Sequence, residues 1–528
     1  MMIIMKNLFK IIFSFSVVLF FVSCTKNLDR KPNTGTYAND VYANVDGYKV
    51  QLAKIYSAFA LTGSNGPGTS DLGGIDAGTS DFLRLYWNAQ ELSTDEAICA
   101  WNDPGVPDFH NLNWTSSNTI LTGLYNRCLY QIAVANSYIQ ESTPDKVAGR
   151  GISGADADAI KQFVAEARFL RAYQYSVLMD LFGNPPFVTD TVAIGGSFLP
   201  KQISRADLFT YVEGELKAIE ADLADPHQNE YGRADKAAEW ALLARIYINA
   251  TVYNGVDHNA DALTYAQKVI DAGYSLKPTY KELFYADNNV NNPEVILSIN
   301  YDALYTQNYG GTTFLVNSAI NGDMDPASFG VPSGGWGGNR TTKNLPDLFP
   351  STTGEPDTRA LFYGDKKEID NVGTFTDGLR TTKFRNINSD GTVPANAGTF
   401  TNVDFPIFRL AEMYLIYAEA QLRGGGGTKD KAIEYFNDLR QRAYGNTSGN
   451  VADITLDDVL DERARELYWE GFRRTDLVRY NKFTSASYLW PWKGGIKDGT
   501  GVADKYNLFP LPSTDIIANP NLVQNQGY

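Results

Sequence analysis

The sequence predicts a mostly α-helical protein: a tetratricopeptide-like helical-repeat scaffold with a loop-rich insertion that carries minor β-strands. Two observations predict this architecture. Apolar residues recur at helical spacing through residues 46–61, 119–284 and 406–480. Residues 285–405 are instead rich in Gly, Asn, Thr and Asp and show no long helical pattern. The chain of 528 residues is 43% hydrophobic and 20% charged, which excludes a disordered chain.

The helices can be placed individually from their apolar faces. The first is expected where Tyr48, Leu52, Ile55 and Phe59 share one helical face. The same spacing predicts further helices over about 119–142, 163–181, 204–223, 235–251, 260–272, 409–423, 429–444 and 455–475. Ser204 with Asp207, and Thr455 with Asp458, have the spacing of N-terminal capping residues. Successive helices joined by short connections favour packed pairs, although no clean 34-residue repeat is present.

The loop-rich parts of the chain are expected to carry function. We predict a single domain over residues 46–528, with ligand-binding loops at about 62–118, 285–405 and 485–528. A segment as long as 285–405 is uncommon as plain loop inside a compact domain, so it is predicted to be a functional insertion. Within it, the run from Glu294 to Ile299 is typical of a short strand.

The N-terminus has the features of an exported lipoprotein. Residues 1–23 combine Lys6 and Lys10 with a short apolar stretch and end on Ser23, directly before Cys24. An apolar stretch, a small residue and then a cysteine resemble a bacterial lipobox, in which Cys24 would carry the lipid. An ordinary signal peptide with an incidental cysteine is the alternative. Residues 24–45 are polar and are expected to form a tether from the lipid to the folded body.

Composition excludes several classes of function. The net charge of −15 disfavours nucleic acid, because phosphate binding needs a basic surface. Three His and three Cys are too few for a typical metal cage or a disulfide scaffold. No phosphate-binding loop, zinc-protease helix or serine-hydrolase motif is present. Two positioned carboxylates would still suffice for a glycoside hydrolase, so an enzyme remains an alternative at this stage.

Three smaller interpretations follow from residue types. Cys99 and Cys128 are expected to be buried thiols, with a disulfide as the alternative. The charged residues of segment 461–474 are expected to form ion pairs three or four residues apart along one helix. Asp287, Asn289 and Glu294 are weak candidates for calcium ligands in an oxygen-rich turn, for which a solvated turn is the simpler interpretation. No other cofactor is expected.

Aromatic residues in the irregular segments are the main indication of a binding site. Sugars present apolar C–H faces that pack on aromatic rings, and an exposed aromatic cluster with polar neighbours is typical of such a site. Each ring alone is more often buried beneath its loop. Tyr309 and Trp336, in glycine-rich segments, favour binding most strongly. The aromatic residues considered are Trp87, Trp101, Trp114, Tyr309, Trp336, Trp490 and Trp492.

Several motifs together resemble the SusD/RagB family of Bacteroidetes outer-membrane glycan-binding lipoproteins. They are Glu166-Ala-Arg-Phe-Leu-Arg-Ala-Tyr, Leu181-Phe-Gly-Asn-Pro-Pro-Phe, Gly232-Arg-Ala-Asp-Lys-Ala-Ala, Phe408-Arg-Leu-Ala-Glu-Met-Tyr-Leu, Glu462-Arg-Ala-Arg-Glu-Leu and Glu470-Gly-Phe-Arg-Arg-Thr-Asp-Leu-Val-Arg. The likeness covers essentially the whole chain after Cys24. It implies a scaffold of four tetratricopeptide-like units, no catalysis, and a lipid anchor at the cell surface. It also implies a partner, a SusC-like TonB-dependent transporter that imports oligosaccharide.

The binding residues can be carried over from the starch-binding branch of this family, which the chain resembles most. The segments that carry the likeness include Glu91–Glu96, Asn308–Thr313 and Leu489–Gly495. By position, the resemblance implies stacking and polar contacts to glycan from Trp101, Tyr309, Trp336, Asp76, Arg84 and Asn102.

Two departures alter this family site. A tryptophan of the family site falls on Cys99 here, and an asparagine falls on Pro104. We therefore expect an α-glucan as the first ligand and a curved β-1,3-glucan as the second. A scaffold that binds only protein is a third alternative.

Overall fold

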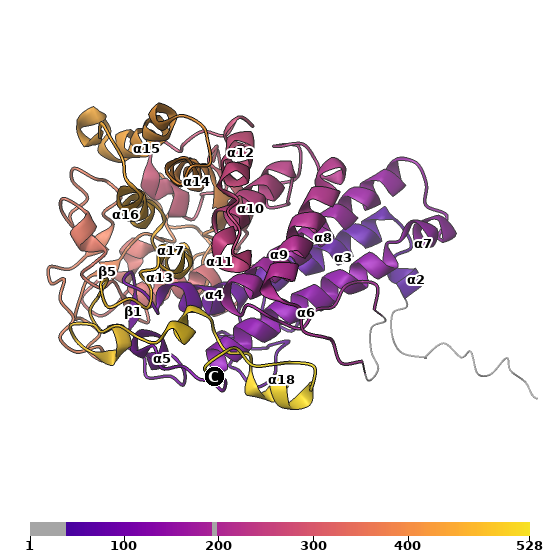
Figure 1. Cartoon of the computed structure of the whole chain (residues 1–528), viewed down its shortest axis with the longest axis horizontal. Coiled ribbons are helices and arrows are strands. Elements are labelled where there is room, and N and C mark those ends of the chain that lie inside the picture. Colours follow the sequence, from indigo (N-terminus) through magenta and orange to yellow (C-terminus); the bar gives the residue numbers. More distant parts are fainter. Residues whose placement is uncertain (1–37, 193–197) are drawn as a thin grey trace, which may run out of the picture.

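Helices packed side by side form the body of the computed structural model, which describes residues 38–192 and 198–528 (Figure 1). After the short helix α2 (Ala38–Val41), a first group packs together, in which α8 contacts α3, α6 and α9. A second group follows, in which α10 contacts α12, and α14 contacts α12, α15 and α16. The bounds are α3 Val45–Ala60, α6 Thr119–Glu141, α8 Ala155–Leu181, α9 Arg205–Ile219, α10 Lys236–Ile248, α12 Asn259–Ile270, α14 Leu410–Leu422, α15 Lys429–Tyr444 and α16 Leu456–Leu467.

The scaffold helices form where their apolar spacing places them. Tyr48, Leu52, Ile55 and Phe59 are all buried on one face of α3, as predicted. Ser204 caps α9 by accepting a hydrogen bond from the Asp207 amide. Thr455 and Asp458 form a reciprocal capping box at the start of α16. The prediction of a mostly helical, tetratricopeptide-like scaffold is confirmed.

The loop-rich regions contain short strands and short helices. Three antiparallel two-stranded sheets occur in the described ranges: β1 (Ile98–Cys99) with β3 (Asn339–Arg340), β2 (Val295–Ile299) with β6 (Phe405–Arg409), and β4 (Phe362–Tyr363) with β5 (Arg380–Thr381). The predicted strand near 294–299 is confirmed. The β2–β6 pair joins the two ends of the insertion, since Val295 faces Arg409 and Ile299 faces Phe405. The remaining helices are α4 Phe82–Glu91, α5 Pro107–Asn111, α7 Pro144–Gly149, α11 Ala250–Asn254, α13 Gly311–Ala319, α17 Arg473–Arg479 and α18 Ser513–Ala518.

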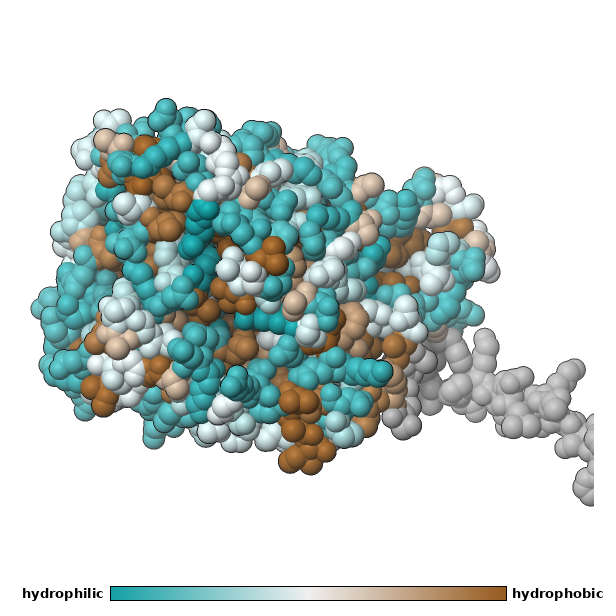
Figure 2. Space-filling view, in the orientation of Figure 1, coloured by the Kyte–Doolittle hydropathy of each residue, from teal (hydrophilic) through white to brown (hydrophobic). Residues whose placement is uncertain are grey.

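The face of the molecule in Figure 2 is mostly hydrophilic, with apolar side chains gathered at the lower edge over α18. Ile517 of α18 is 84% exposed. No helix in ranges 38–192 and 198–528 combines the length and hydropathy that a bilayer-spanning segment needs. Cys24 and the rest of the predicted signal peptide and lipobox lie outside the described residues.

The expected helix over 455–475 is interrupted, which corrects the sequence interpretation. It ends at Leu467 and resumes as α17 at Arg473. Between them Trp469 and Gly471 adopt positive φ angles of 64° and 83°. A β-carbon at position 471 would meet the ring of Tyr86, so the turn requires glycine there. The amides freed by the turn find acceptors at and just beyond the end of α4, because Gly471 N donates to Glu91 and Trp469 N donates to Glu96.

The charged residues of segment 461–474 do not form simple surface pairs along a helix, which is a second correction. Arg465 does pair with Glu462 three residues earlier, at 2.7 Å. The other main partners are buried and distant in sequence. We call this group the charge network; it comprises Glu294, Asp357, Arg359, Lys383, Arg409, Arg442, Glu462, Glu466 and Glu470.

Arg409, at the end of β6, holds the centre of the charge network. Its guanidinium lies 2.8 Å from Glu294, 2.5 Å from Glu466 and 2.8 Å from Glu470. Arg359 similarly joins Asp357 at 2.8 Å, Glu462 at 2.7 Å and Glu466 at 3.1 Å. Although burial opposes ionisation, the arginines around Glu466 hold the pKa of its carboxyl well below the ordinary value. The insertion is therefore fastened to α16 by ionised groups that are almost fully buried.

We expect Arg409→Met to destabilise the protein by about 3–5 kcal/mol, because it leaves several buried carboxylates without their central partner. Chemical unfolding of the purified chain measures the effect. Lys343→Met is the matched control, since the Lys343–Asp347 pair is 2.7 Å long but 41% and 42% exposed. Its loss should change stability by about 1 kcal/mol or less. Equal effects of the two substitutions would contradict a dominant role for the charge network.

Candidate functional site

Three loop aromatics meet at the surface of the insertion. The ring centroids of Tyr309 and Trp336 are 6.5 Å apart and their planes differ by 45°. Phe400, from a third segment, lies 5.3 Å from Tyr309. Tyr309 is 41% exposed, and Trp336 and Phe400 are half-buried. We call Tyr309, Trp336 and Phe400 the aromatic platform.

Trp101 lies beside the aromatic platform and packs against two of its three segments. Its half-buried ring is 5.9 Å from Phe314, on the helix α13 that begins directly after Tyr309 and Gly310. It also packs on Gly338, two residues after Trp336. The Arg84 guanidinium lies 5.5 Å from the Trp101 ring and donates a hydrogen bond of 3.4 Å to the Tyr309 carbonyl. Arg84 therefore links Trp101 to the platform.

The polar residues expected at the site do not all lie in the same pocket. Asp76 is exposed, and its carboxylate accepts hydrogen bonds from the backbone and the hydroxyl of Thr79 at 3.0 and 3.2 Å. Asp76, Arg84 and Trp101 line one pocket of about 210 Å³. Asn102 is exposed and is not among the residues that line this pocket, whereas the following Asp103 and Pro104 are. The structure thus brings five of the six residues into two adjoining groups.

A buried carboxylate positions the loop that carries Tyr309. Asp81 caps α4 by accepting from the Arg84 amide at 2.9 Å, and the same oxygen accepts from the Gly311 amide at 2.8 Å. Burial raises the pKa of Asp81 to about 6, so the group is mainly ionised at neutral pH. The start of α13 and the start of α4 are therefore held together through one side chain.

Other aromatics that the sequence placed in loops belong to the core. Trp87, Trp114 and Trp490 are at most 1% exposed. The indole of Trp87 donates to the Trp469 carbonyl at 3.1 Å, and that of Trp114 donates to the Tyr528 hydroxyl at 2.8 Å. For these residues the interpretation as buried rings is correct. Phe400 was missed by sequence reasoning, although it follows the glycine-containing run Ala397-Gly398-Thr399.

The structure also tests the predictions for the cysteines and for the calcium ligands. Cys99 and Cys128 are buried and free, as predicted, and burial raises the pKa of the Cys99 thiol to about 12. The suggested calcium ligands do not converge, which corrects that interpretation. Glu294 is buried against Arg409 and Arg442, whereas Asp287 accepts hydrogen bonds from Ser389. No acidic or His/Cys cluster suited to a metal ion occurs among the described residues.

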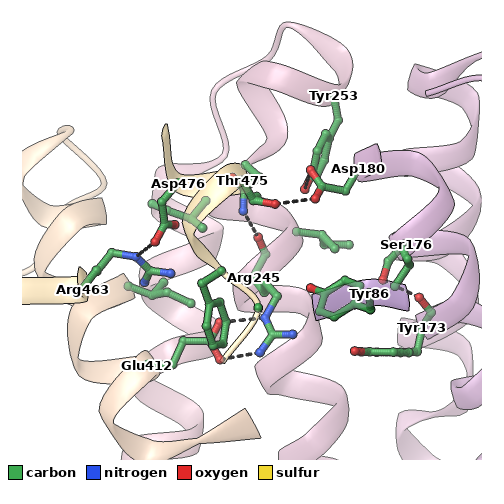
Figure 3. Close-up of a pocket in the computed structure, with 17 residues that line it drawn as sticks. Tyr86, Tyr173, Ser176, Asp180, Arg245, Tyr253, Glu412, Arg463, Thr475 and Asp476 are labelled. Atoms are coloured by element: carbon green, nitrogen blue, oxygen red, sulfur yellow. Dashed lines mark hydrogen bonds and ion pairs between the residues drawn. The ribbon is translucent and has the colours of Figure 1, made fainter. Parts of the chain in front are cut away.

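A second cavity, of about 40 Å³, lies between α4, α8, α10, α14 and α17 (Figure 3). Its polar side chains already bond one another: Arg245 pairs with Glu412 at 2.7 Å, and Arg463 with Asp476 at 2.7 Å. The volume suits ordered water rather than a sugar ring. This cavity is therefore a polar junction between the scaffold helices.

Comparison with known proteins places these features in a family. The family model described as "SusD family" matches residues 358–528. The chain is 38% identical to the starch-binding protein SusD of Bacteroides thetaiotaomicron, over 90% of this chain and 91% of that protein. It is 24% identical to a SusD-like protein of Bacteroides ovatus, over 92% of this chain and 84% of that one.

Solved structures share the same fold. The surface glycan-binding protein A of Bacteroides thetaiotaomicron, solved in complex with laminarihexaose, has a TM-score of 0.69 at 20% identity. The match covers 91% of this chain and 99% of that chain. A laminarin-binding SusD-like protein also has a TM-score of 0.69, at 22% identity over 92% of this chain and 100% of that chain.

The similarity of most of this chain to these proteins identifies its class, a non-catalytic glycan-binding protein of the bacterial cell surface. The chain belongs to the SusD family, whose members are such proteins in Bacteroidetes. The predicted family is therefore confirmed, and the family's lack of catalysis agrees with the prediction of a binding protein.

Gly338→Ala is expected to displace the Trp101 ring, because a β-carbon at this position would overlap the indole. The near-ultraviolet circular dichroism of the protein should change accordingly. Gly334→Ala is the matched control: its φ of 99° resembles the 111° of Gly338, but a β-carbon there meets nothing within 4 Å. Both substitutions carry the strain of a positive φ, so both should lower stability. Identical spectra for the two variants would contradict the packing of Trp101 on Gly338.

Proposed function

We propose that the protein captures α-glucan of the starch type on the aromatic platform and Trp101, and delivers it to a SusC-like TonB-dependent transporter. The observation that carries the proposal is the pair Tyr309 and Trp336, whose rings are tilted against each other at the surface, in a chain 38% identical to a starch-binding protein. Asp76 and Arg84 are proposed as the polar contacts, with Asn102 at the exposed margin.

The tilt of the rings favours a curved ligand. Successive sugars of a helical glucan turn relative to one another, so rings at 45° can each meet the apolar face of a different sugar. A flat, ribbon-like β-1,4-glucan would instead need nearly coplanar rings. Burial of C–H surface supplies most of the affinity, since sugar hydroxyls bond almost as well to water.

A β-1,3-glucan is the second candidate ligand. Its chain is also curved, and a protein of this fold has been solved with laminarihexaose. By the family resemblance, Cys99 stands in the position of a site tryptophan and Pro104 in that of an asparagine. These two departures from the starch-binding pattern keep the β-1,3-glucan as an alternative ligand.

Trp336→Ala should weaken binding to glucan by roughly thirtyfold or more, because loss of a central aromatic anchor typically costs about 2 kcal/mol. Affinity electrophoresis in gels that contain starch or laminarin measures retention. The melting temperature should fall no further than in the Trp240→Ala control below, since both rings are half-buried and pack against the core.

Trp240→Ala is the matched control, because Trp240 is a half-buried tryptophan of α10, distant in sequence from the platform. It should leave retention intact. Normal retention of the Trp336→Ala variant on both glucans, with a lowered melting temperature, would show that Trp336 is a core residue. Release of reducing ends from starch would support a hydrolase instead.

For the anchor, Cys24→Ala should abolish labelling of the protein by radioactive palmitate in cells, because the lipobox offers only that thiol for acylation. The protein should still fold and bind glucan. Cys99→Ala is the control and should be labelled like the wild type, since Cys99 is buried. Undiminished labelling of Cys24→Ala would contradict the lipoprotein assignment.

A further inference from the structure

A separate groove adjoins the pocket beside Trp101 and is lined by none of the six residues assigned to the glucan site. It lies between the loop 72–75 and the starts of α6 and α18, and its volume of about 340 Å³ falls within the roughly 300–1,000 Å³ of ligand sites. The groove and the pocket share Gly74, Ile75 and Thr119, so the two hollows are continuous. We call it the hydroxyl groove, after its polar side chains: Ser116, Ser117, Thr119, Thr122, Asn126, Ser513 and Thr514.

The walls of the hydroxyl groove are both fastened to the first turns of α6. On one side, the hydroxyl of Tyr125 on α6 donates a hydrogen bond to Asp515 of α18. On the other side, Ile75 packs so closely on Gly123 of α6 that a β-carbon at position 123 would overlap its side chain. The loop 72–75 and α18 are therefore set at a fixed separation, and the groove is formed without a ligand.

The polar groups of the hydroxyl groove are uncharged and available. None of the lining residues in the described ranges is charged. Thr122 and Asn126 lie one helical turn apart on α6, on the same face as Thr119. Among the described residues, the side chains of Thr122, Asn126 and Ser513 make no hydrogen bond. All three are half-buried, and their polar atoms are not enclosed by the protein, so a ligand in the groove can reach them.

These groups suit a neutral ligand that carries many hydroxyls. A serine or threonine hydroxyl both donates and accepts, and the Asn126 amide does the same through its two ends, so each can bond a sugar hydroxyl. A charged ligand would find no counter-charge among the lining residues. A protein partner is disfavoured, because protein interfaces draw most of their energy from anchors such as Trp, Tyr and Arg, whereas the groove offers only Leu72 and Ile75 as large apolar side chains.

We propose that the hydroxyl groove extends the glucan site and binds further sugar residues of a neutral chain whose other part lies on Trp101 and the aromatic platform. This inference rests on the proposed function and adds selection for long chains to it. Thr122, Asn126 and Ser513 hydrogen-bond the sugar hydroxyls, and Ile75 offers an apolar surface to their C–H groups. Short oligosaccharides occupy the platform and do not reach the groove.

The test measures binding of short and long oligosaccharides by calorimetry on the full purified chain. The probes are maltotriose with maltodecaose, and laminaritriose with laminaridecaose. The double variant Thr122→Val, Asn126→Leu removes hydrogen-bonding groups that have no partner in the folded chain. For the series that binds, this variant should bind the decaose about three- to tenfold more weakly than the wild type does, as the loss of one or two hydrogen bonds would give. Its affinity for the triose should equal that of the wild type.

Two further variants support the comparison. Asn126→Ala alone is a milder change and should weaken decaose binding in the same direction by a smaller factor. The control is Thr210→Val, Gln441→Leu, which makes the same kinds of change on α9 and α15, outside the groove. The control should bind both lengths like the wild type. The melting temperatures should show that every variant is folded.

The outcomes separate this inference from the proposed function. Wild-type affinity of the double variant for the decaose would overturn the groove assignment and leave glucan capture by the platform standing. Equal weakening of triose and decaose binding would also overturn it, because the substitutions would then act on the platform site itself. Binding of neither glucan by the folded wild type would overturn both proposals.

Discussion

The buried charge network around Arg409 and Glu466 is the interaction on which the other parts of the structure depend. It joins the first residues of the insertion, through Glu294, to its middle, through Arg359, and to the helices that follow it. Burying so many charges is costly unless each is paired, so the pairs specify one arrangement of these segments more than they add net stability. In this way the insertion of about 120 residues, which contains no long helix, is held in one position on the scaffold.

Lys383 shows how closely the charge network is balanced. Its ammonium lies 2.7 Å from Glu470 and donates to the Tyr468 carbonyl, within a wholly buried site. Burial lowers the pKa of Lys383 to about 8 even though Glu470 favours the charged form. The turn between α16 and α17 thus places Glu470 where two cations, Arg409 and Lys383, require it.

The scaffold was predictable from the sequence, whereas the charge network was not. Helices such as α3 and α6 follow from local apolar spacing, and their bounds agree with the predicted ranges within a few residues. The acidic residues of α16 also have helical spacing to nearby arginines, which favoured local pairs. The actual partner of Glu466 is Arg409, 57 residues away in sequence, and no short-range pattern encodes that distance. The break around Gly471 was missed for a similar reason: the ring of Tyr86, which leaves no room for a β-carbon at position 471, is even more remote in sequence.

The site was predictable only in part, for a related reason. Loop position alone does not separate a ring on the surface, such as Tyr309, from one in the core, such as Trp114. The resemblance to a family selected Trp101, Tyr309 and Trp336. It could not indicate Phe400, since the position of that ring depends on how separate loops meet.

The way in which these loops are held bears directly on binding. The start of α13, which directly follows Tyr309, is fixed by Asp81, Trp101 is seated against Gly338, and Arg84 connects the two. Ordering a mobile side chain on binding costs about 0.5–1.5 kcal/mol, so rings that are already fixed spare the complex that loss. A glycan gains little from each hydroxyl, and a small saving per ring is then a large share of its net affinity. If the proposed function holds, the polar contacts beneath the loops, rather than additional contacts to the sugar, are what would make a surface of tilted rings sufficient for capture.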